Sequence, residues 1–458
     1  MTPDPHKTWD EPMSIPLSFN QEFLCMFDQG DEEGPFGPLY NIVGGWRITG
    51  KIDTEALQGA LNDVVARHEA LRTTVVRTPG EQRQEIRPPL PVSLAVREIP
   101  EPDPALRDRR AEELLIELEG GRYGVTELPL MRAVLGRFDE EDAVLVLVVH
   151  HTAADEVSMQ LIIRDLGVLY ARRRGHDAGE LPEATPFRDF AVWERERYAP
   201  TAEVKARAYW REQLAGATIT GVPSDHLKSA GVPKTTSVHR FLVDAELTSA
   251  ALAVAKETRS SAFMVLLAAY KVFLNERVGA TDVAVPTMAS GRGPARFQNT
   301  VGAFFNFVPL RTDLSGAATF REVVERTRAT CLKAYGNFLP FGQVVAEAPA
   351  SAASFAADDL GVVAFQVFQF PALESEEAGD LRISEIRRRL LSQDVSTDIP
   401  DGVMFQLDID PLSGEMLGHL GFNTNLFREA TMREFAAGFV RVLARTVTTP
   451  DAPLEPAS

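Results

Sequence analysis

The segment of residues 143–149 restricts the fold more than any other part of the sequence. It reads Ala-Val-Leu-Val-Leu-Val-Val, with no polar residue among the apolar ones. A strand with one face in water alternates apolar and polar residues, whereas a strand covered on both faces is apolar throughout. The run is much too short to cross a bilayer. We therefore expect a central strand in a sheet that is covered on both sides.

Strand and helix patterns recur in both halves of the 458-residue chain. A chain of this length exceeds what one compact core usually accommodates. A polar stretch with glycine and proline, residues 174–186, is a plausible linker. We therefore predict an α/β (α+β) fold with two lobes, residues 1–178 and 179–458. An irregular arm is expected over 1–16 and a frayed tail over 450–458.

Hydrophobic periodicity indicates where the other elements lie. Helices are expected over 57–71, 105–119, 157–175, 186–214, 248–274 with a break at 260–261, 320–335 and 432–446. Strands are expected over 73–77, 238–243, 282–288, 304–310, 361–370, 404–409 and 418–422, with the last two joined by a turn. Residues 79–104 are rich in proline and predict a loop with an edge strand.

Charge and cysteine content exclude several classes of protein. The net charge of −18 comes from 47 basic and 65 acidic side chains. Such a field repels phosphate backbones and anionic membranes, so we expect no nucleic-acid or membrane binding. Cys25 and Cys331 lie far apart in sequence, which disfavours a disulfide framework or a zinc site. The N-terminus lacks the apolar segment of a secretory signal. We expect a cytoplasmic protein with no bound metal or cofactor.

The loop after the apolar strand reads His150-His151-Thr-Ala-Ala-Asp155-Glu156. The carboxyl end of a central strand is where open sheets usually offer a site. Adjacent side chains of an extended segment point in opposite directions, so one histidine can face a cleft while the other packs. A neutral imidazole can accept a proton from a nucleophile. Asp155 could cap the next helix, orient a histidine or pair with a distant arginine.

Other interpretations of these residues stay open at this point. The loop could be a structural histidine pair with a capping aspartate, because short motifs often occur by chance. The sequence has no G-x-S-x-G nucleophile elbow and no G-x-x-x-x-G-K-[ST] phosphate loop. The tight turn Ser290-Gly-Arg292-Gly-Pro is either a solvated loop or a means of bringing Arg292 towards an acid such as Asp155.

The His loop is one of several motifs that occur in a fixed order. The others are Ser18-Phe-Asn-Gln21, Arg67-His68-Glu69-Ala-Leu71-Arg72-Thr73, Phe187-Arg-Asp189-Phe190-Ala191-Val-Trp193, Val301-Gly302-Ala-Phe304-Phe-Asn306 with Arg311, Asn337-Phe-Leu-Pro340-Phe341, and Gly421-Phe-Asn423-Thr-Asn-Leu426-Phe427. Over about residues 14–446 the chain resembles the condensation domains of nonribosomal peptide synthetases, whose signature is His-His-x-x-x-Asp-Gly.

The resemblance implies a chloramphenicol-acetyltransferase-like fold, with two lobes in a V-shaped pseudo-dimer and a channel between them. It implies that His151 acts as a base or positions the nucleophile, and that His150 is a weaker catalytic candidate. Asp155 then has a mainly structural role, and Arg292 stands where family members carry the arginine that pairs with it. Asn306 belongs to a motif expected at the channel.

Glu156 departs from the family signature, because it replaces the glycine. A glycine allows backbone and substrate to approach closely, so a glutamate should narrow or charge the channel. It could favour a cationic acceptor or raise the pKa of His151. We expect Glu156→Gly to keep the fold and to change the acceptor preference; unchanged kinetics with every acceptor would count against a channel role.

The resemblance also implies the reaction and the partners. Because the match uses nearly the whole chain, we expect a free-standing, monomeric enzyme. A separate carrier protein would deliver the acyl or aminoacyl thioester on its phosphopantetheine arm, and a small amine or alcohol would accept it. Two alternatives are an acyl-coenzyme A-dependent acyltransferase of the same fold and a non-catalytic domain that recruits another enzyme to a carrier.

Overall fold

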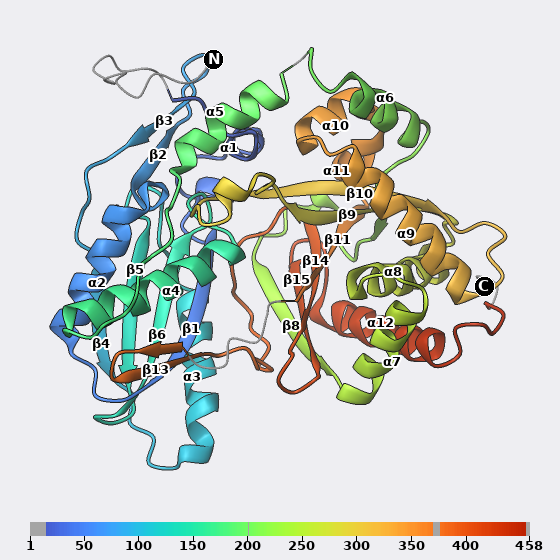
Figure 1. Ribbon diagram of the computed structural model, residues 1–458. Coiled ribbons are helices and arrows are strands. Elements are labelled where there is room, and N and C mark those ends of the chain that lie inside the picture. Colours follow the sequence, from blue (N-terminus) through green and yellow to red (C-terminus); the bar gives the residue numbers. More distant parts are fainter. Residues whose placement is uncertain (1–14, 200, 370–375, 455–458) are drawn as a thin grey trace.

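Two lobes lie side by side in the computed structural model, each with one large sheet and a set of helices (Figure 1). The structure describes residues 15–199, 201–369 and 376–454. Most of the expected arm (1–16), the end of the expected tail (450–458) and the last residue of the strand expected over 361–370 lie outside those ranges.

The elements follow the chain in this order. The first lobe contains α1 (Phe19–Cys25), β1 (Asn41–Thr49), α2 (Thr54–Arg67), β2 (Thr73–Val76), β3 (Arg83–Ile86), β4 (Ser93–Glu98), α3 (Pro104–Glu119), β5 (Met131–Arg137), β6 (Asp142–His150) and α4 (Glu156–Arg173). The chain continues with α5 (Phe187–Arg197), α6 (Val204–Gln213), β7 (Gly221–Pro223), β8 (Thr236–Val243), α7 (Ala245–Glu257), α8 (Ala262–Val278), β9 (Asp282–Ser290), β10 (Phe305–Asp313), α9 (Phe320–Gly336), α10 (Phe341–Glu347), α11 (Ala353–Ala356), β11 (Leu360–Phe368), β12 (Glu376–Ala378), β13 (Leu381–Glu385), β14 (Gly402–Ile409), β15 (Met416–Asn423) and α12 (Glu429–Thr448).

Strand β6 is central in the first lobe, as its uninterrupted apolar sequence predicts. The six-stranded sheet has the order β12-β13-β1-β6-β5-β4. Leu145 and Leu147 pack in a core with α2 and α4 on one face, whereas Val144 and Val146 pack with α3 on the other. All four side chains are fully buried. The end of β6 is therefore held rigidly between two layers of helices.

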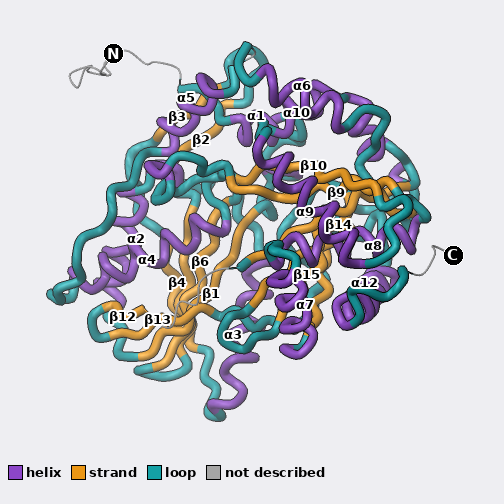
Figure 2. The backbone as a smooth tube through the Cα atoms, turned by 45° about the vertical axis from the view of Figure 1, so that its right-hand side comes forward, coloured by secondary structure: helices purple, strands orange, loops and turns teal. Residues whose placement is uncertain are grey.

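The second lobe is built on a seven-stranded sheet. Its main order is β10-β9-β11-β14-β15-β8, and β7 pairs with β11. The antiparallel hairpin β14–β15 confirms the strand pair expected from the sequence. Helices α7, α8, α9 and α12 pack in one core against one face of this sheet. Figure 2 shows the strands of the two lobes as separate groups. The four helices lie on the side of the second sheet away from the first lobe (Figure 1).

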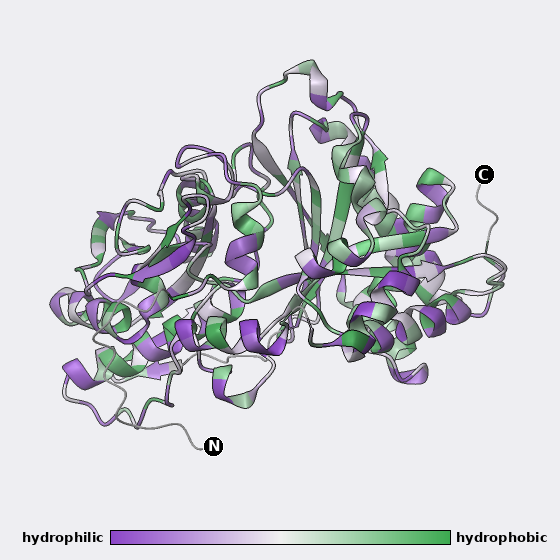
Figure 3. Ribbon diagram, turned by 90° about the horizontal axis from the view of Figure 1, so that it is seen from above, coloured by the Kyte–Doolittle hydropathy of each residue, from purple (hydrophilic) through white to green (hydrophobic). Residues whose placement is uncertain are grey.

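Hydropathy follows the same layers. The strands of the second lobe are largely hydrophobic, whereas the surrounding helices mix hydrophobic and hydrophilic residues (Figure 3). Among the helices formed by described residues, none is both long enough and apolar enough to cross a membrane.

Two segments from the second half of the chain pack against the first lobe. The crossover loop, which we define as residues 291–304, places Phe297 and Phe304 in the core of the first lobe. The hairpin β12–β13 extends the first sheet, with β13 antiparallel to β1. The division of the chain at residue 178 stays a prediction, but residues 376–385 belong to the sheet of the first lobe.

A buried carboxylate joins α2 to α4 and so fixes the helix that follows the His loop. Asp165 of α4 accepts hydrogen bonds from Arg67 Nε at 2.8 Å and contacts His68 Nε2 at 2.9 Å. Burial raises the pKa of Asp165, but its bonds to His68 and Arg164 outweigh burial and lower the pKa to about 2. The second sequence motif, residues 67–73, therefore has a structural part in positioning α4.

A second buried cluster ties the two lobes together. Glu119, at the end of α3, accepts hydrogen bonds from Arg240 of β8 at 3.2 Å and from Arg389 at 3.0 Å. Burial raises the pKa of Glu119, but the two guanidinium groups reverse the effect and lower it to about 2. Removing one partner from such a cluster leaves an uncompensated buried charge.

Replacing Lys271 with methionine is expected to stabilise the protein. Lys271 is fully buried in α8 and donates to Thr312 Oγ1 at 2.6 Å. Burial lowers the pKa of Lys271 from 10.5 to about 7. Because the unfolded chain keeps this proton up to its higher pKa, wild-type stability should rise between these two pH values. Methionine removes the charge, and we expect a gain on the order of 3 kcal/mol at pH 6.

Urea denaturation of both proteins at pH 6 and pH 9 measures this effect. The difference in free energy of unfolding between the wild-type protein and Lys271→Met should be smaller at pH 9 than at pH 6. The exposed Lys256→Met of α7 serves as the matched control and should change stability little at either pH. A gap for Lys271→Met that is the same at both pH values would contradict the assignment of a buried, ionisable amine.

Candidate active site

The candidate site lies between the end of β6 and the start of α4. The strand ends at His150, and Asp155 caps the helix by accepting the Ser158 backbone N–H at 2.8 Å. Between them the chain makes a tight turn, in which the Ala153 N–H donates to the His150 carbonyl at 2.9 Å. A rigid strand and a capped helix thus hold the loop from both sides.

The ring of His151 has one engaged nitrogen and one available nitrogen. Nδ1 lies 2.8 Å from the Ala154 carbonyl oxygen, which can only accept, so Nδ1 carries the proton. Within the described residues no group hydrogen-bonds to Nε2, and the side chain is partly exposed. Burial lowers the pKa of His151 below 6.5, while the Ala154 carbonyl and Asp155 oppose this shift. The ring is therefore neutral at pH 7, with a lone pair on Nε2.

Two aromatic rings fix the plane of His151. Tyr40 stacks on it with ring centroids 4.9 Å apart and an angle of 22°, and Phe305 of β10 lies at 4.9 Å in a tilted arrangement. The backbone N–H of His151 also donates to the Tyr40 carbonyl at 2.8 Å. Tyr40 comes from the first lobe and Phe305 from the second, so both lobes position this imidazole.

The structure corrects the expectation for His150. Its side chain is fully buried, Nδ1 lies 2.9 Å from Thr152 Oγ1, and Nε2 lies 3.2 Å from the Gly37 carbonyl oxygen. Burial lowers the pKa of His150 to about 3, so the ring is neutral. Because both nitrogens are already engaged inside the core, His150 supports the loop and offers no atom to a substrate.

Asp155 and Arg292 form the ion pair that the resemblance implies. Arg292 NH1 donates to Asp155 Oδ2 at 2.5 Å and NH2 donates to Oδ1 at 2.7 Å. The guanidinium also donates to Ser158 Oγ at 2.8 Å and lies 4.1 Å from the Phe304 ring centroid. Arg292 is 3% exposed. The turn at residues 290–294 is therefore not a solvated loop. Its Arg292 holds the crossover loop against the start of α4.

Asn306 has a structural role, and its expected place at the channel stays a prediction. Its Nδ2 donates to the Leu339 carbonyl at 3.0 Å, and its Oδ1 accepts the Phe341 N–H at 2.8 Å. The amide thus joins β10 to the start of α10. The two sequence motifs at residues 301–306 and 337–341 are linked through this side chain.

Glu156, the first residue of α4, lies in an acidic region between the lobes. Burial raises its pKa to about 8, and the charges of Glu385 of β13 and Asp408 of β14 add to the rise. Burial lowers the pKa of His151, and the acid that opposes this shift is Asp155 and not Glu156. A channel role for Glu156 stays a prediction.

The other flank of the site is aromatic. Phe23 of α1 packs against Phe27, Phe307 and Phe341 with ring centroids 5.1–5.9 Å apart. The same core includes Met288, which also packs in the cluster containing Phe305. The α1 side of the site is therefore apolar, whereas the acids of β13 and β14 act on Glu156 at the start of α4.

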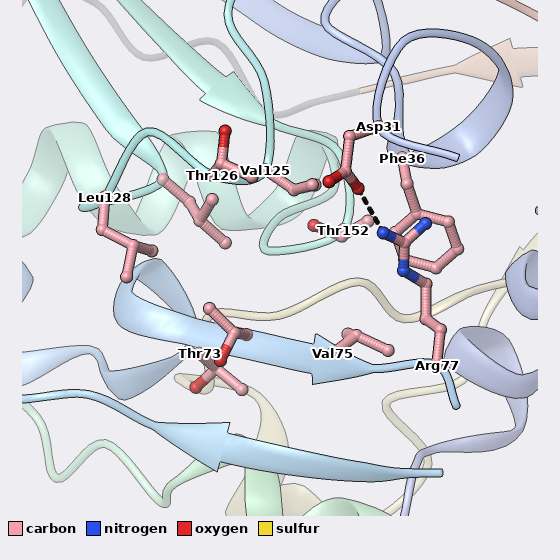
Figure 4. A pocket seen from close by; sticks show the side chains of 11 residues that line it. Asp31, Phe36, Thr73, Val75, Arg77, Val125, Thr126, Leu128 and Thr152 are labelled. Atoms are coloured by element: carbon pink, nitrogen blue, oxygen red, sulfur yellow. Dashed lines mark hydrogen bonds and ion pairs between the residues drawn. The ribbon is translucent and has the colours of Figure 1, made fainter. Parts of the chain in front are cut away.

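A small cavity lies beside Thr152 of the loop. Its volume is ≈ 150 Å³, and Thr152, Thr73 and Val75 contribute to its wall, as does the Arg77–Asp31 ion pair (Figure 4). Pockets that hold small-molecule ligands usually have volumes of roughly 300–1,000 Å³. The cavity is too small for a substrate of that size.

Comparison with known proteins defines first the fold and then the family. The fold is the chloramphenicol-acetyltransferase-like fold of solved condensation domains; the first condensation domain of the CDA synthetase, for example, matches with a TM-score of 0.71 and 19% identity over 97% of this chain and 98% of that chain. The family model for the condensation domain matches residues 13–457. This chain belongs to the condensation-domain family.

Two similar proteins have higher sequence identity than that condensation domain. The SgcC5 protein from Streptomyces globisporus, solved with (R)-(-)-1-(2-naphthyl)-1,2-ethanediol and sucrose, is 51% identical with a TM-score of 0.92, over 96% of this chain and 100% of that chain. CymA of Salinispora arenicola, a probable nonribosomal peptide synthetase, is 33% identical over 467 residues, which cover 97% of this chain and 6% of the synthetase. The chain thus spans a small part of this large relative.

A more distant likeness concerns the fold alone. The X-domain from teicoplanin biosynthesis has a TM-score of 0.76 and 24% identity, over 98% of this chain and 99% of that chain.

Proposed function

We propose that this protein transfers an acyl or aminoacyl group from a carrier-protein thioester to an amine or alcohol. Nε2 of His151 accepts the proton of the nucleophile while the oxygen or nitrogen of that nucleophile forms a bond to the thioester carbon. The carbon–sulfur bond then breaks, and the proton passes to the departing thiolate of the phosphopantetheine arm. The products are an ester or amide and a free thiol.

One observation carries this proposal: the neutral, oriented imidazole of His151. The Ala154 carbonyl retains the proton on Nδ1, so the lone pair of a base is on Nε2. Tyr40 and Phe305 restrain the ring from either lobe. An alcohol needs this base more than an amine does, because an amine only has to arrive deprotonated. The diol named with SgcC5 supports a hydroxyl-bearing acceptor.

The remaining roles follow from the same arrangement. Asp155 and Arg292 are positioning residues that hold the loop, and Glu156 lies at the substrate channel between the lobes. The carrier protein acts in trans, and the protein works as a cytoplasmic monomer with lobes 1–178 and 179–458. The products belong to nonribosomal natural-product biosynthesis, of the kind that yields antibiotics.

One assay separates this proposal from its two rivals. The protein is mixed with an acyl-carrier thioester or with the matching acyl-coenzyme A, together with a panel of amines and alcohols, and the assay is repeated with His151→Ala. Product from the carrier thioester that disappears in His151→Ala supports the proposal. Product from coenzyme A alone would replace it with a coenzyme A-dependent acyltransferase. No product, with carrier binding retained, would indicate a recruitment domain, as the replacement of the motif glycine by Glu156 also allows.

A further inference from the structure

Three carboxylates from both lobes gather beside the start of α4. Glu156 is on α4, Glu385 ends β13 and Asp408 is on β14. Each of the other two charges raises the pKa of Glu156, and Glu385 raises that of Asp408, so the three groups interact electrostatically. Arg387 is the cation that opposes them, and its Nε donates to Glu385 Oε2 at 2.8 Å. The acids therefore outnumber the cation that the chain places among them.

Three unsatisfied oxygen atoms belong to this cluster or to the glutamines that adjoin it. Asp408 Oδ1, Gln160 Oε1 and Gln366 Oε1 are buried and accept no hydrogen bond from the described residues. Gln366 is only 8% exposed. Burying a carbonyl or carboxylate oxygen without a donor costs about 1–3 kcal/mol for each group. A ligand that donates hydrogen bonds would satisfy these oxygens.

Contacts place these oxygens around the carboxylates. Gln160 lies one helical turn after Glu156, and its Nε2 donates to Glu385 Oε1 at 3.0 Å. Gln366 of β11 pairs with Gln406 of β14 in the parallel register, and its Nε2 donates to Gln406 Oε1 at 2.8 Å. Because residues 406 and 408 are two apart on one strand, Gln366 and Asp408 share a face of the sheet. That face is the one opposite the helical core of the second lobe.

We propose that Glu156, Asp408 and the oxygens of Gln160 and Gln366 bind the protonated amine of a substrate that reacts at His151. This inference rests on the proposed function and names a recognition element within it. An ammonium group supplies three N–H donors and one positive charge, which match three unsatisfied oxygens and a surplus of carboxylates. Glu156 supplies a carboxyl group at the position where the family signature has a glycine without a side chain, and a bound ammonium group would favour its charged form.

The amine can belong to either reactant. An aminoacyl donor carries an amino group close to its thioester carbon, and an acceptor can carry an amine beside its nucleophilic group. The chemistry of recognition is the same for both. The side of the site near α1 is aromatic. A reactant with a charged amine should therefore bind with that amine at the acidic side, and a reactant without one should not.

Calorimetry with two ligand pairs tests the proposal and identifies the source of the amine. The donor pair is an aminoacyl-pantetheine amide, in which NH replaces the thioester sulfur, and its des-amino counterpart. The acceptor pair is 2-amino-1-phenylethanol and 1-phenylethanol. At pH 7.5 the wild-type protein should bind the amine of one pair at least about tenfold more tightly than its neutral partner. The double variant Glu156→Gln/Asp408→Asn should bind the amine and its neutral partner with about equal affinity.

Two controls keep the result interpretable. Glu246→Gln, an exposed residue on α7, changes the net charge without touching the cluster and should keep the wild-type preference. Gln366→Leu removes one oxygen and should weaken the preference severalfold if the double variant does not fold. The proposal is overturned if the wild-type protein prefers the amine in neither pair, or if the double variant keeps the preference. Because binding is measured without turnover, failure of acyl transfer and failure of this site are distinguishable.

Discussion

Replacing Arg292 with alanine is expected to lower the free energy of unfolding by about 3–5 kcal/mol and to abolish most activity. The variant loses both bonds to Asp155, the bond to Ser158 Oγ and the contact with the Phe304 ring. Asp155 is left as a buried carboxylate without its cation. The crossover loop then loses its hold on the start of α4, and the His151 ring loses its fixed position.

Urea denaturation and transfer assays measure the two effects of Arg292→Ala. Arg296→Ala is the matched control, because Arg296 is an exposed arginine on the same crossover loop. Its free energy of unfolding should change by less than about 1 kcal/mol. Equal changes in both variants would show that the Asp155–Arg292 pair does not hold the loop.

His151→Ala is expected to reduce the rate of transfer to an alcohol by about 10²–10⁴ while the protein stays folded. The loss should be smaller with an amine acceptor, which needs less help from a base. In the wild-type protein, kcat/KM should rise with pH to a plateau, with an inflection below 6.5, because burial lowers the pKa of His151. The variant should lose this inflection.

His150→Ala provides the contrast for that result. Because His150 is buried with both nitrogens engaged, its loss should lower stability and leave the inflection in the remaining activity. A His151→Ala variant that transfers at the wild-type rate would remove the imidazole from the mechanism.

The apolar strand and the loop behind it could be predicted because their signals are local. Residues 143–149 alone identify a doubly covered strand, and the spacing of His151 and Asp155 places them at the adjoining turn. The residues alone offered the Asp155–Arg292 pair only as one of two alternatives, because 137 residues separate the partners, and the family resemblance favoured it. Tyr40 and Phe305 were missed as neighbours of His151, since each is an ordinary core aromatic until the fold brings it there.

Strand β1 was missed for a packing reason. It contains Gly44 and Gly45, which weaken a strand pattern. A Cβ at Gly44 would lie 2.5 Å from the Trp46 ring, and one at Gly45 would lie 2.7 Å from Leu115 of α3. These glycines make room for large side chains, and that need is visible only in three dimensions. The short hairpin β12–β13 was missed because its place depends on pairing with this same strand.

The protonation state of His151 at pH 7 tests the central claim most directly. Nuclear magnetic resonance of protein labelled with ¹⁵N in its imidazoles reports which ring nitrogen carries hydrogen, and the spectrum of His151→Ala identifies the signals. We predict a neutral ring with hydrogen on Nδ1 and a bare Nε2. A doubly protonated ring, or hydrogen on Nε2, would contradict the assignment of His151 as the base.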